Sequence, residues 1–210
     1  YGNGFANSFA GGSINESVGN FNQRNAKTEK LVYWGESHDT YANDGGESKN
    51  KSQNVIDRAY AVVAGNNGAT ALYFSRPFQK DKGAIKFGDK GSVHFKDAEV
   101  AQVNYMHNVC AGEPNYYVKG NGVCAQVRKS GAIIVLGSGS DRDVTVANGA
   151  GDGKWLMSGT YKDMVGGGVF TVNASTISGH VGESGIAVIY NAGSIVLPPE
   201  VLFNPADGTA

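Results

Sequence analysis

The sequence has little of what membrane or nucleic-acid partners require. Its 18 Lys and Arg residues against 19 Asp and Glu give a formal net charge of -1 over 210 residues. Binding to nucleic acid or to an anionic membrane depends on clustered basic side chains, so we expect neither partner. No run of about 18 apolar residues is present, which argues against a membrane-spanning helix.

Cysteine is scarce as well, with two residues in the chain, Cys110 and Cys124. A disulfide between them would close a loop of about 15 residues and stabilise the fold by about 3 kcal/mol in the chain-entropy model. Two buried free thiols fit the sequence equally well. Neither the cysteines nor the four histidines follow the spacing of a metal site, so we predict no metal ligand in this chain.

The N-terminal half alternates strand-like and helical patterns. Leu31 to Trp34 is an apolar run of strand length, and residues 52–65 place apolar side chains on one helical face. A second apolar run in 69–77 and a second helical pattern in 96–112, with Asp97 as the N-cap, repeat the unit. This alternation predicts a parallel sheet covered by helices, with ligands bound at the carboxyl ends of the strands.

From Pro114 the pattern changes to short alternating runs separated by Gly, Asn, Asp and Ser, which is typical of an antiparallel β-sandwich. We therefore expect three parts, residues 1–112, a sandwich over 113–191, and a linker over 192–210 that leads to a further module. The absence of an initiator Met and of a closing element indicates a chain that continues at both ends.

The segment "LVYWGESHDTYAND" places Glu36, Ser37, His38 and Asp39 directly after the first strand. Ionisable groups are costly to desolvate, so this cluster lies either in a solvated turn or in a functional site. A Ser–His–Asp relay is disfavoured, because consecutive residues on a strand point to opposite faces. A lone His–Asp pair is ordinarily a turn or helix cap, but its place at the carboxyl end of a strand favours a sugar-binding site.

This segment resembles the strand-seven motif of the α-amylase family, glycoside hydrolase family 13, and is especially similar to the secreted bacterial enzymes of the Bacillus subtilis type. "ALYFSRP" resembles their eighth strand, and "FGDKGSVHFKDAEVAQVNYMHNVCAG" their eighth loop and helix. The resemblance implies the last two βα units of a (β/α)8 barrel followed by a C-terminal β-sandwich. It covers roughly residues 30 to 191.

The resemblance also implies the function of the parent enzyme, retaining endo-hydrolysis of α-1,4-glucosidic bonds in starch and malto-oligosaccharides. It maps the carboxylate that supports the distorted sugar onto Asp39, and sugar-binding roles onto His38 and Asn43. Glu36 is expected to orient an arginine. The nucleophile and the acid/base belong to strands outside this chain, so the isolated chain should be inactive.

The family further implies a secreted, monomeric enzyme with calcium, whose ligands are expected outside this chain. Two alternatives remain open. One is a non-catalytic carbohydrate-binding or structural β module that uses Tyr116, Tyr117 and Trp155. The other is a transglycosylase or α-glucosidase of the same family.

Overall fold

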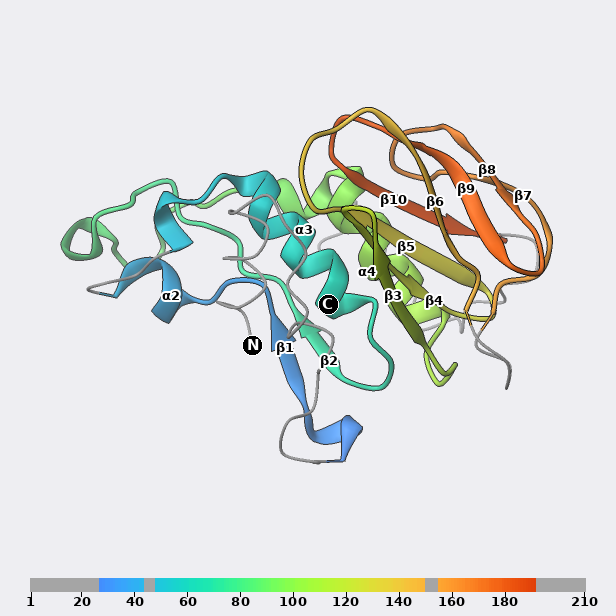
Figure 1. The fold of residues 1–210 in the computed structure, drawn as a ribbon. Helices are drawn as coiled ribbons and strands as arrows, with labels where there is room; N and C mark the ends of the chain where they lie inside the picture. The colour runs from blue at the N-terminus through green and yellow to red at the C-terminus, as the bar shows by residue number, and fades with distance from the viewer. Residues whose placement is uncertain (1–26, 44–47, 150–154, 192–210) are drawn as a thin grey trace, which may run out of the picture.

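The computed structural model describes residues 27–43, 48–149 and 155–191. A helical part with two parallel strands lies beside a part made of two antiparallel sheets (Figure 1). The predicted linker over 192–210 lies outside the described residues. Within them, no helix has the length and apolar character needed to cross a membrane.

The first part contains the predicted parallel pair of strands. Strand β1 (Val32–Trp34) pairs with β2 (Thr70–Leu72), with Val32 opposite Thr70 and Trp34 opposite Leu72. Helix α3 (Gln53–Ala64) connects the two strands, so the expected βαβ arrangement is confirmed. The short elements here are η2 (Thr28–Lys30), α2 (His38–Ala42) and η3 (Ser48–Asn50).

Helix α3 begins at Ser52, whose hydroxyl accepts a hydrogen bond from the Val55 amide at 3.3 Å. Every residue from Ile56 to Ala64 is buried, because the helix contacts β1 and β2 on one side and the antiparallel strands β4 and β5 on the other. A helix buried all round needs no polar face.

Helix α4 (Ala98–Val109) follows η4 (Lys82–Ala84) and η5 (His94–Lys96). Asp97 is its N-cap residue, but the Asp97 side chain makes no capping hydrogen bond. It contacts the His94 ring instead, so the predicted capping role is wrong for the side chain. The sequence places Val100, Val103, His107 and Cys110 on one face of this helix, and the structure buries Val100, Val103 and Cys110 and leaves His107 half-buried.

The antiparallel part has two four-stranded sheets, which form the predicted sandwich. The inner sheet has the order β10-β5-β4-β3 and the outer sheet β6-β9-β8-β7. The strands are β3 (Tyr116–Gly120), β4 (Val123–Val127), β5 (Gly131–Leu136), β6 (Arg142–Ala147), β7 (Gly159–Lys162), β8 (Val169–Val172), β9 (Thr176–Val181) and β10 (Ile186–Tyr190).

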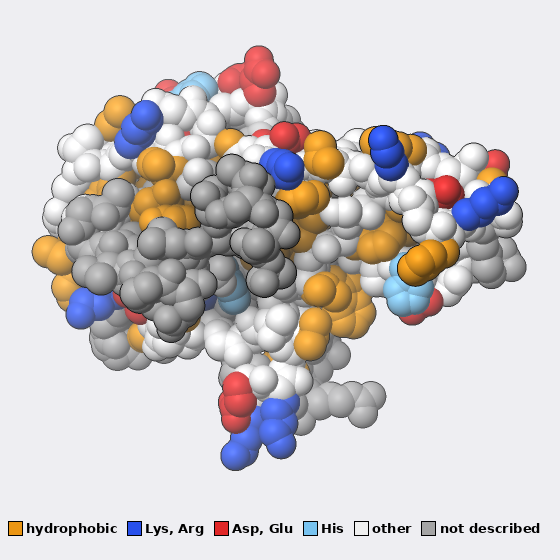
Figure 2. All heavy atoms as spheres, turned by 180° about the vertical axis from the view of Figure 1, so that it is seen from behind, with side chains coloured by type: hydrophobic (Ala, Val, Ile, Leu, Met, Phe, Trp, Pro, Cys, Tyr) orange, Lys and Arg blue, Asp and Glu red, His pale blue; other side chains and the backbone are white. Residues whose placement is uncertain are grey.

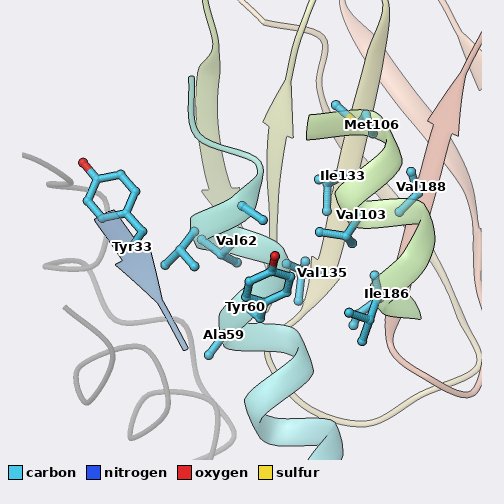
Figure 3. Close-up of a cluster of buried hydrophobic side chains, with 14 of the residues drawn as sticks. Tyr33, Ala59, Tyr60, Val62, Val103, Met106, Ile133, Val135, Ile186 and Val188 are labelled. Carbon is cyan, nitrogen blue, oxygen red and sulfur yellow. The ribbon is translucent and has the colours of Figure 1, made fainter. Parts of the chain in front are cut away.

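The inner sheet is covered on both faces, which explains why β4, β5 and β10 are buried at every residue. Ile133, Val135 and Val188 point toward α3 and α4 and form one apolar core with them (Figure 3). Their neighbours Ile134, Leu136 and Ile189 pack against the outer sheet in a second core. The helices, the inner sheet and the outer sheet are therefore stacked in this order, and the parallel pair β1 and β2 packs on the other side of α3.

Candidate functional site

The polar cluster directly follows β1, as expected, and continues from Glu36 and Ser37 into a short helix rather than along the strand. Strand β1 ends at Trp34, and α2 begins at His38 with Ser37 as its N-cap. The Ser37 hydroxyl accepts from the Thr40 amide at 3.4 Å, while the Thr40 hydroxyl accepts from the Ser37 amide at 2.9 Å. This capping box satisfies two amides of a helix too short to be stable alone.

The capping geometry also excludes a Ser–His–Asp relay. The Ser37 hydroxyl interacts with the backbone of its own helix, and the His38 ring contacts Asp39 rather than Ser37. The predicted absence of a relay thus has a different physical reason, because the residues are on a helix start and not on alternating faces of a strand.

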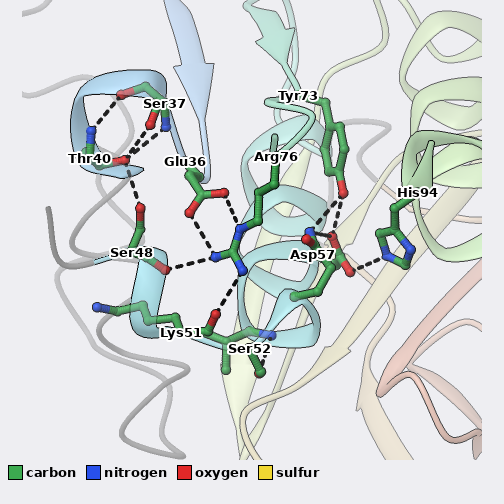
Figure 4. A network of polar contacts seen from close by, with 12 residues as sticks. Glu36, Ser37, Thr40, Ser48, Lys51, Ser52, Asp57, Tyr73, Arg76 and His94 are labelled. Carbon is green, nitrogen blue, oxygen red and sulfur yellow. Dashed lines mark hydrogen bonds and ion pairs between the residues drawn. The ribbon is translucent and has the colours of Figure 1, made fainter. Parts of the chain in front are cut away.

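A buried ion pair joins the carboxyl ends of the two parallel strands (Figure 4). Glu36, 2% exposed, lies just after β1, and Arg76 follows β2. Arg76 Nε donates to Glu36 Oε2 at 2.7 Å, and its terminal nitrogen donates to Oε1 at 2.8 Å. Such bidentate pairing fixes geometry strongly, and Glu36 therefore holds an arginine, as the sequence suggested.

Arg76 also holds the segment that follows α2. Its guanidinium donates to the carbonyls of Ser48 and Lys51, each at 2.9 Å. Its carbon Cζ lies 5.3 Å from the ring centre of Tyr41, which in turn packs on Phe74. Burial raises the pKa of Tyr41 above its usual range. One arginine thus fixes α2, η3 and both strand ends.

His38, Asp39 and Asn43, the three predicted site residues, are brought together on the exposed side of α2. Asn43 donates through its side-chain nitrogen to Asp39 Oδ1 at 2.8 Å. His38 Nε2 lies 3.3 Å from the same oxygen. The side chains of His38 and Asp39 are 79% and 66% exposed, so both can be reached from solvent. The carboxylate is therefore available to a ligand.

A pocket of about 550 Å³ lies beside His38. Its walls are mainly apolar and include Tyr41, Phe74, Ile85 and Phe95. Hydrophobic side chains are visible at several places on the surface seen from behind (Figure 2), and Val32 and Leu72 of the parallel strands are 48% and 54% exposed. The region around α2 therefore offers both a charged group and apolar contact surface.

A second polar group, formed by Asp57, His94 and Glu99, was missed by sequence reasoning. These residues come from α3, η5 and α4, and no short spacing connects them. Arg76 was also missed, because it is far from Glu36 in the sequence. Its position after the second parallel strand could have predicted that it lies at the same edge of the sheet as Glu36. Parallel strands end at the same edge of a sheet.

The aromatic side chains considered for a carbohydrate-binding module are mostly packed. Tyr116 packs against the core between the two sheets, and Tyr117 packs against the core under the helices. Trp155 is 43% exposed. The three rings thus do not form one exposed platform.

The matches to known proteins agree with this fold. An α-amylase of Butyrivibrio fibrisolvens is 30% identical over 179 residues, which cover 78% of this chain and 18% of that protein. An α-amylase of Clostridium acetobutylicum is 28% identical over 169 residues, covering 80% of this chain and 20% of that protein. The chain spans about a fifth of the length of these relatives. No family model matches.

Solved structures give the same result at lower identity. The α-amylase I of Eisenia fetida, as an E249Q mutant in complex with maltohexaose, matches with a TM-score of 0.68 and 16% identity, covering 90% of this chain and 48% of that one. An α-amylase of Malbranchea cinnamomea matches with a TM-score of 0.60 and 12% identity, covering 90% and 44%. These likenesses concern the fold.

Two βα units of a (β/α)8 barrel followed by an antiparallel β-sandwich define the class of fold, and this class is the one the sequence predicted. Over most of its length the chain is similar in sequence to α-amylases, and it shares their fold. The closer likeness to the Bacillus subtilis type stays a prediction.

The resemblance implies calcium, and the candidate metal ligands among the described residues can be compared with what calcium requires. The group of Asp57, His94 and Glu99 is the one set of three candidate ligands found there. Calcium takes about six to eight oxygen ligands, whereas this group offers two carboxylates and one imidazole nitrogen. It does not fit calcium. That calcium ligands lie outside this chain stays a prediction.

Proposed function

We propose that the chain is the C-terminal part of an α-amylase that hydrolyses α-1,4-glucosidic bonds in starch and malto-oligosaccharides with retention. Its sequence similarity to α-amylases and the maltohexaose complex of the structurally similar Eisenia fetida enzyme support this substrate class. Endo-cleavage and retention are inferred from the family resemblance of the residues around Asp39.

In this proposal Asp39 supplies a negative charge beside the sugar at the cleavage point, where positive charge develops in the oxocarbenium-like transition state. His38 and Asn43 bind hydroxyl groups of the substrate. One observation carries the proposal, which is that all three polar groups converge on the exposed side of a capped helix that the Glu36–Arg76 pair holds at the strand ends.

The nucleophilic Asp and the acid/base Glu would belong to other strands of the same barrel, outside this chain. The isolated 210-residue chain should then show no hydrolysis, because it offers no proton donor beside a positioned nucleophile. We also propose that the enzyme is a secreted monomer.

The test compares Asp39→Asn with the wild type in the full-length protein. If the charge acts on the transition state, kcat on soluble starch should fall about 10³-fold or more while KM changes little. Asp81→Asn, on the exposed loop after β2, serves as the matched control and should keep wild-type turnover.

Near-native turnover of Asp39→Asn would contradict the role of Asp39. The proposal that the parent protein is an α-amylase would be contradicted if the coding sequence upstream of Tyr1 encoded no barrel strands that carry the nucleophilic Asp and the acid/base Glu. Starch affinity of residues 113–191 alone would instead favour a binding module.

A further inference from the structure

The group formed by Asp57, His94 and Glu99 joins three elements outside the proposed sugar site (Figure 4 labels Asp57 and His94). Asp57 lies on α3, His94 on η5 at the end of the loop after β2, and Glu99 in the first turn of α4. One ligand atom from each side chain lies within 4.8 Å of the others. Nothing in the proposed sugar chemistry uses these groups.

The Asp57 carboxylate is held in one orientation and is 2% exposed. Its Oδ1 accepts from the Tyr73 hydroxyl at 2.9 Å and from the Gln53 side-chain nitrogen at 3.0 Å. These donors occupy Oδ1 and aim Oδ2 at His94 Nε2, at 2.7 Å. One oxygen of a buried carboxylate is thus fixed toward the imidazole.

The His94 ring is also fixed, through its other nitrogen. Nδ1 contacts the carboxylate of Asp97, while Nε2 faces Asp57 and lies 3.6 Å from Glu99 Oε1. A carboxylate on the far nitrogen orients the ring and raises the basicity of the near one, an arrangement that accompanies most histidines bound to metals.

We propose that Asp57, His94 and Glu99 bind a divalent transition metal of the zinc class through Oδ2, Nε2 and a Glu99 oxygen. One imidazole nitrogen and two carboxylate oxygens match the ligands that Zn²⁺ accepts, and a water molecule completes four-coordination. The side chains of His94 and Glu99 are 21% and 25% exposed, which leaves a path from solvent.

Metal binding replaces the hydrogen bond between His94 Nε2 and Asp57 Oδ2, and the proton of that bond is released to solvent. Zinc bonds of about 2.0–2.2 Å separate tetrahedral ligand atoms by about 3.4 Å, so the Nε2–Oδ2 contact must widen by several tenths of an ångström. The Nε2–Glu99 separation of 3.6 Å already has the required size. Once the metal has displaced the proton from Nε2, the carboxylates of Asp57, Asp97 and Glu99 surround the ion, and their negative charge favours a dication.

The bound ion would fasten the end of the loop after β2 to α3 and α4. This loop contributes Phe95 and Ile85 to the pocket beside His38, so the metal would stabilise one wall of that pocket. The site itself does not depend on the proposed hydrolytic function.

The test is calorimetric titration of the 210-residue chain with Zn²⁺, followed by visible spectroscopy with Co²⁺ as a replacement. We expect one equivalent of Zn²⁺ per chain and a Co²⁺ spectrum of four-coordination. His94→Gln should abolish both signals. Asp97→Asn, which removes the orienting carboxylate, should weaken Zn²⁺ affinity about 10–100-fold.

His180→Gln is the matched control, because His180 also contacts two carboxylates, those of Asp141 and Asp143, on the exposed outer sheet. It should keep the full stoichiometry, and circular dichroism verifies that each variant is folded. Absence of Zn²⁺ binding to the folded wild type, or binding that survives His94→Gln, would overturn the proposal.

Discussion

At the scale of single residues, burial changes the chemistry of side chains that look ordinary in the sequence. Cys110 and Cys124 belong to the core between the helices and the inner sheet, and the half-buried His107 of α4 contacts the end of α3. None of them is part of the proposed sugar site. Their ionisation is nevertheless measurable, and each can be tested with a single substitution.

His107 should make stability depend on pH. Its Nδ1 lies 2.6 Å from the Ala64 carbonyl oxygen, and burial lowers the pKa of His107 below its usual value. The unfolded chain therefore takes up a proton near pH 6.5, while the folded chain resists protonation. The contribution of His107 to stability should be constant above that pH and should fall as the pH drops below it, by at most about 1.4 kcal/mol per pH unit.

Urea unfolding between pH 8 and pH 5 measures this effect. His107→Gln cannot take up the proton, so from pH 8 to pH 5 its free energy of unfolding should lose less, or gain more, than that of the wild type. His180→Gln controls for the removal of an exposed histidine. Equal pH dependence of His107→Gln and the wild type would refute the assignment.

Cys110 and Cys124 should react slowly in the native protein. Both are free and fully buried, and burial raises the pKa of each thiol to about 12. The thiolate is the reactive form, so native alkylation should be slow and unfolding should release two reactive thiols. Cys124→Ala should halve that number. A non-reduced mass lower by two hydrogens, with no alkylation after unfolding, would show a disulfide instead.

At the scale of secondary-structure elements, the short helix α2 depends on its cap. Ser37→Ala removes the hydroxyl that accepts from the Thr40 amide and should destabilise the protein by about 1 kcal/mol. Because α2 carries Asp39, the same change should also weaken substrate binding or turnover in the full-length protein. Denaturant unfolding and starch kinetics measure the two effects.

Ser52→Ala is the matched control for α2, since Ser52 caps α3 through the Val55 amide in the same way. It should cost similar stability while leaving kinetics unchanged. If both variants changed kinetics equally, the cap of α2 would have no special connection to the site.

The elements themselves were largely predictable. The helical pattern over 52–65 corresponds to α3, Gln53–Ala64, and the pattern over 96–112 contains α4, Ala98–Val109. The apolar run over 69–77 was too long, because pairing with β1 covers only Thr70–Leu72. Periodicity reports which side chains are buried, but the extent of a strand depends on its partner.

The site was predictable only where its residues are close in sequence. His38, Asp39 and Asn43 lie on one short segment and meet in the structure. Arg76 reaches Glu36 across 40 positions, and His94 reaches Asp57 across 37. Such contacts depend on how the helices and strands pack in three dimensions. The spacing of residues along a single sequence does not predict that packing.

At the scale of the whole molecule, the helices and the sandwich are joined by buried side chains that bind backbone carbonyls. Arg58 of α3 donates to Leu136 and Gly139, and Asn54 donates to Ser184. From the opposite side, Gln126 of β4 donates to the Val62 carbonyl. Together with the shared apolar core, these contacts predict that the two parts unfold as one unit.

Arg128 makes the most extensive of these connections. It follows β4, is 1% exposed, and donates to the Gly65 carbonyl at 2.7 Å and to the Cys110 carbonyl at 2.8 Å. These carbonyls lie at the C-terminal ends of α3 and α4, where backbone acceptors lack helical partners and a positive charge is favourable. One guanidinium therefore caps the C-terminal ends of two helices and connects both of them to the sandwich.

Arg128→Met should remove this connection and leave buried carbonyls without donors, at about 1–3 kcal/mol for each group. We expect the free energy of unfolding, measured with denaturant, to fall by at least about 3 kcal/mol, since two helix ends are affected.

Arg128→Lys keeps the positive charge but loses the planar guanidinium, so its free energy of unfolding should lie between those of the wild type and Arg128→Met. Arg142→Met is the matched control, because Arg142 donates to the Gly122 carbonyl at 2.7 Å in an exposed setting. It should cost less than about 1 kcal/mol, and equal losses for Arg128→Met and Arg142→Met would show that the buried guanidinium does not hold the layers together.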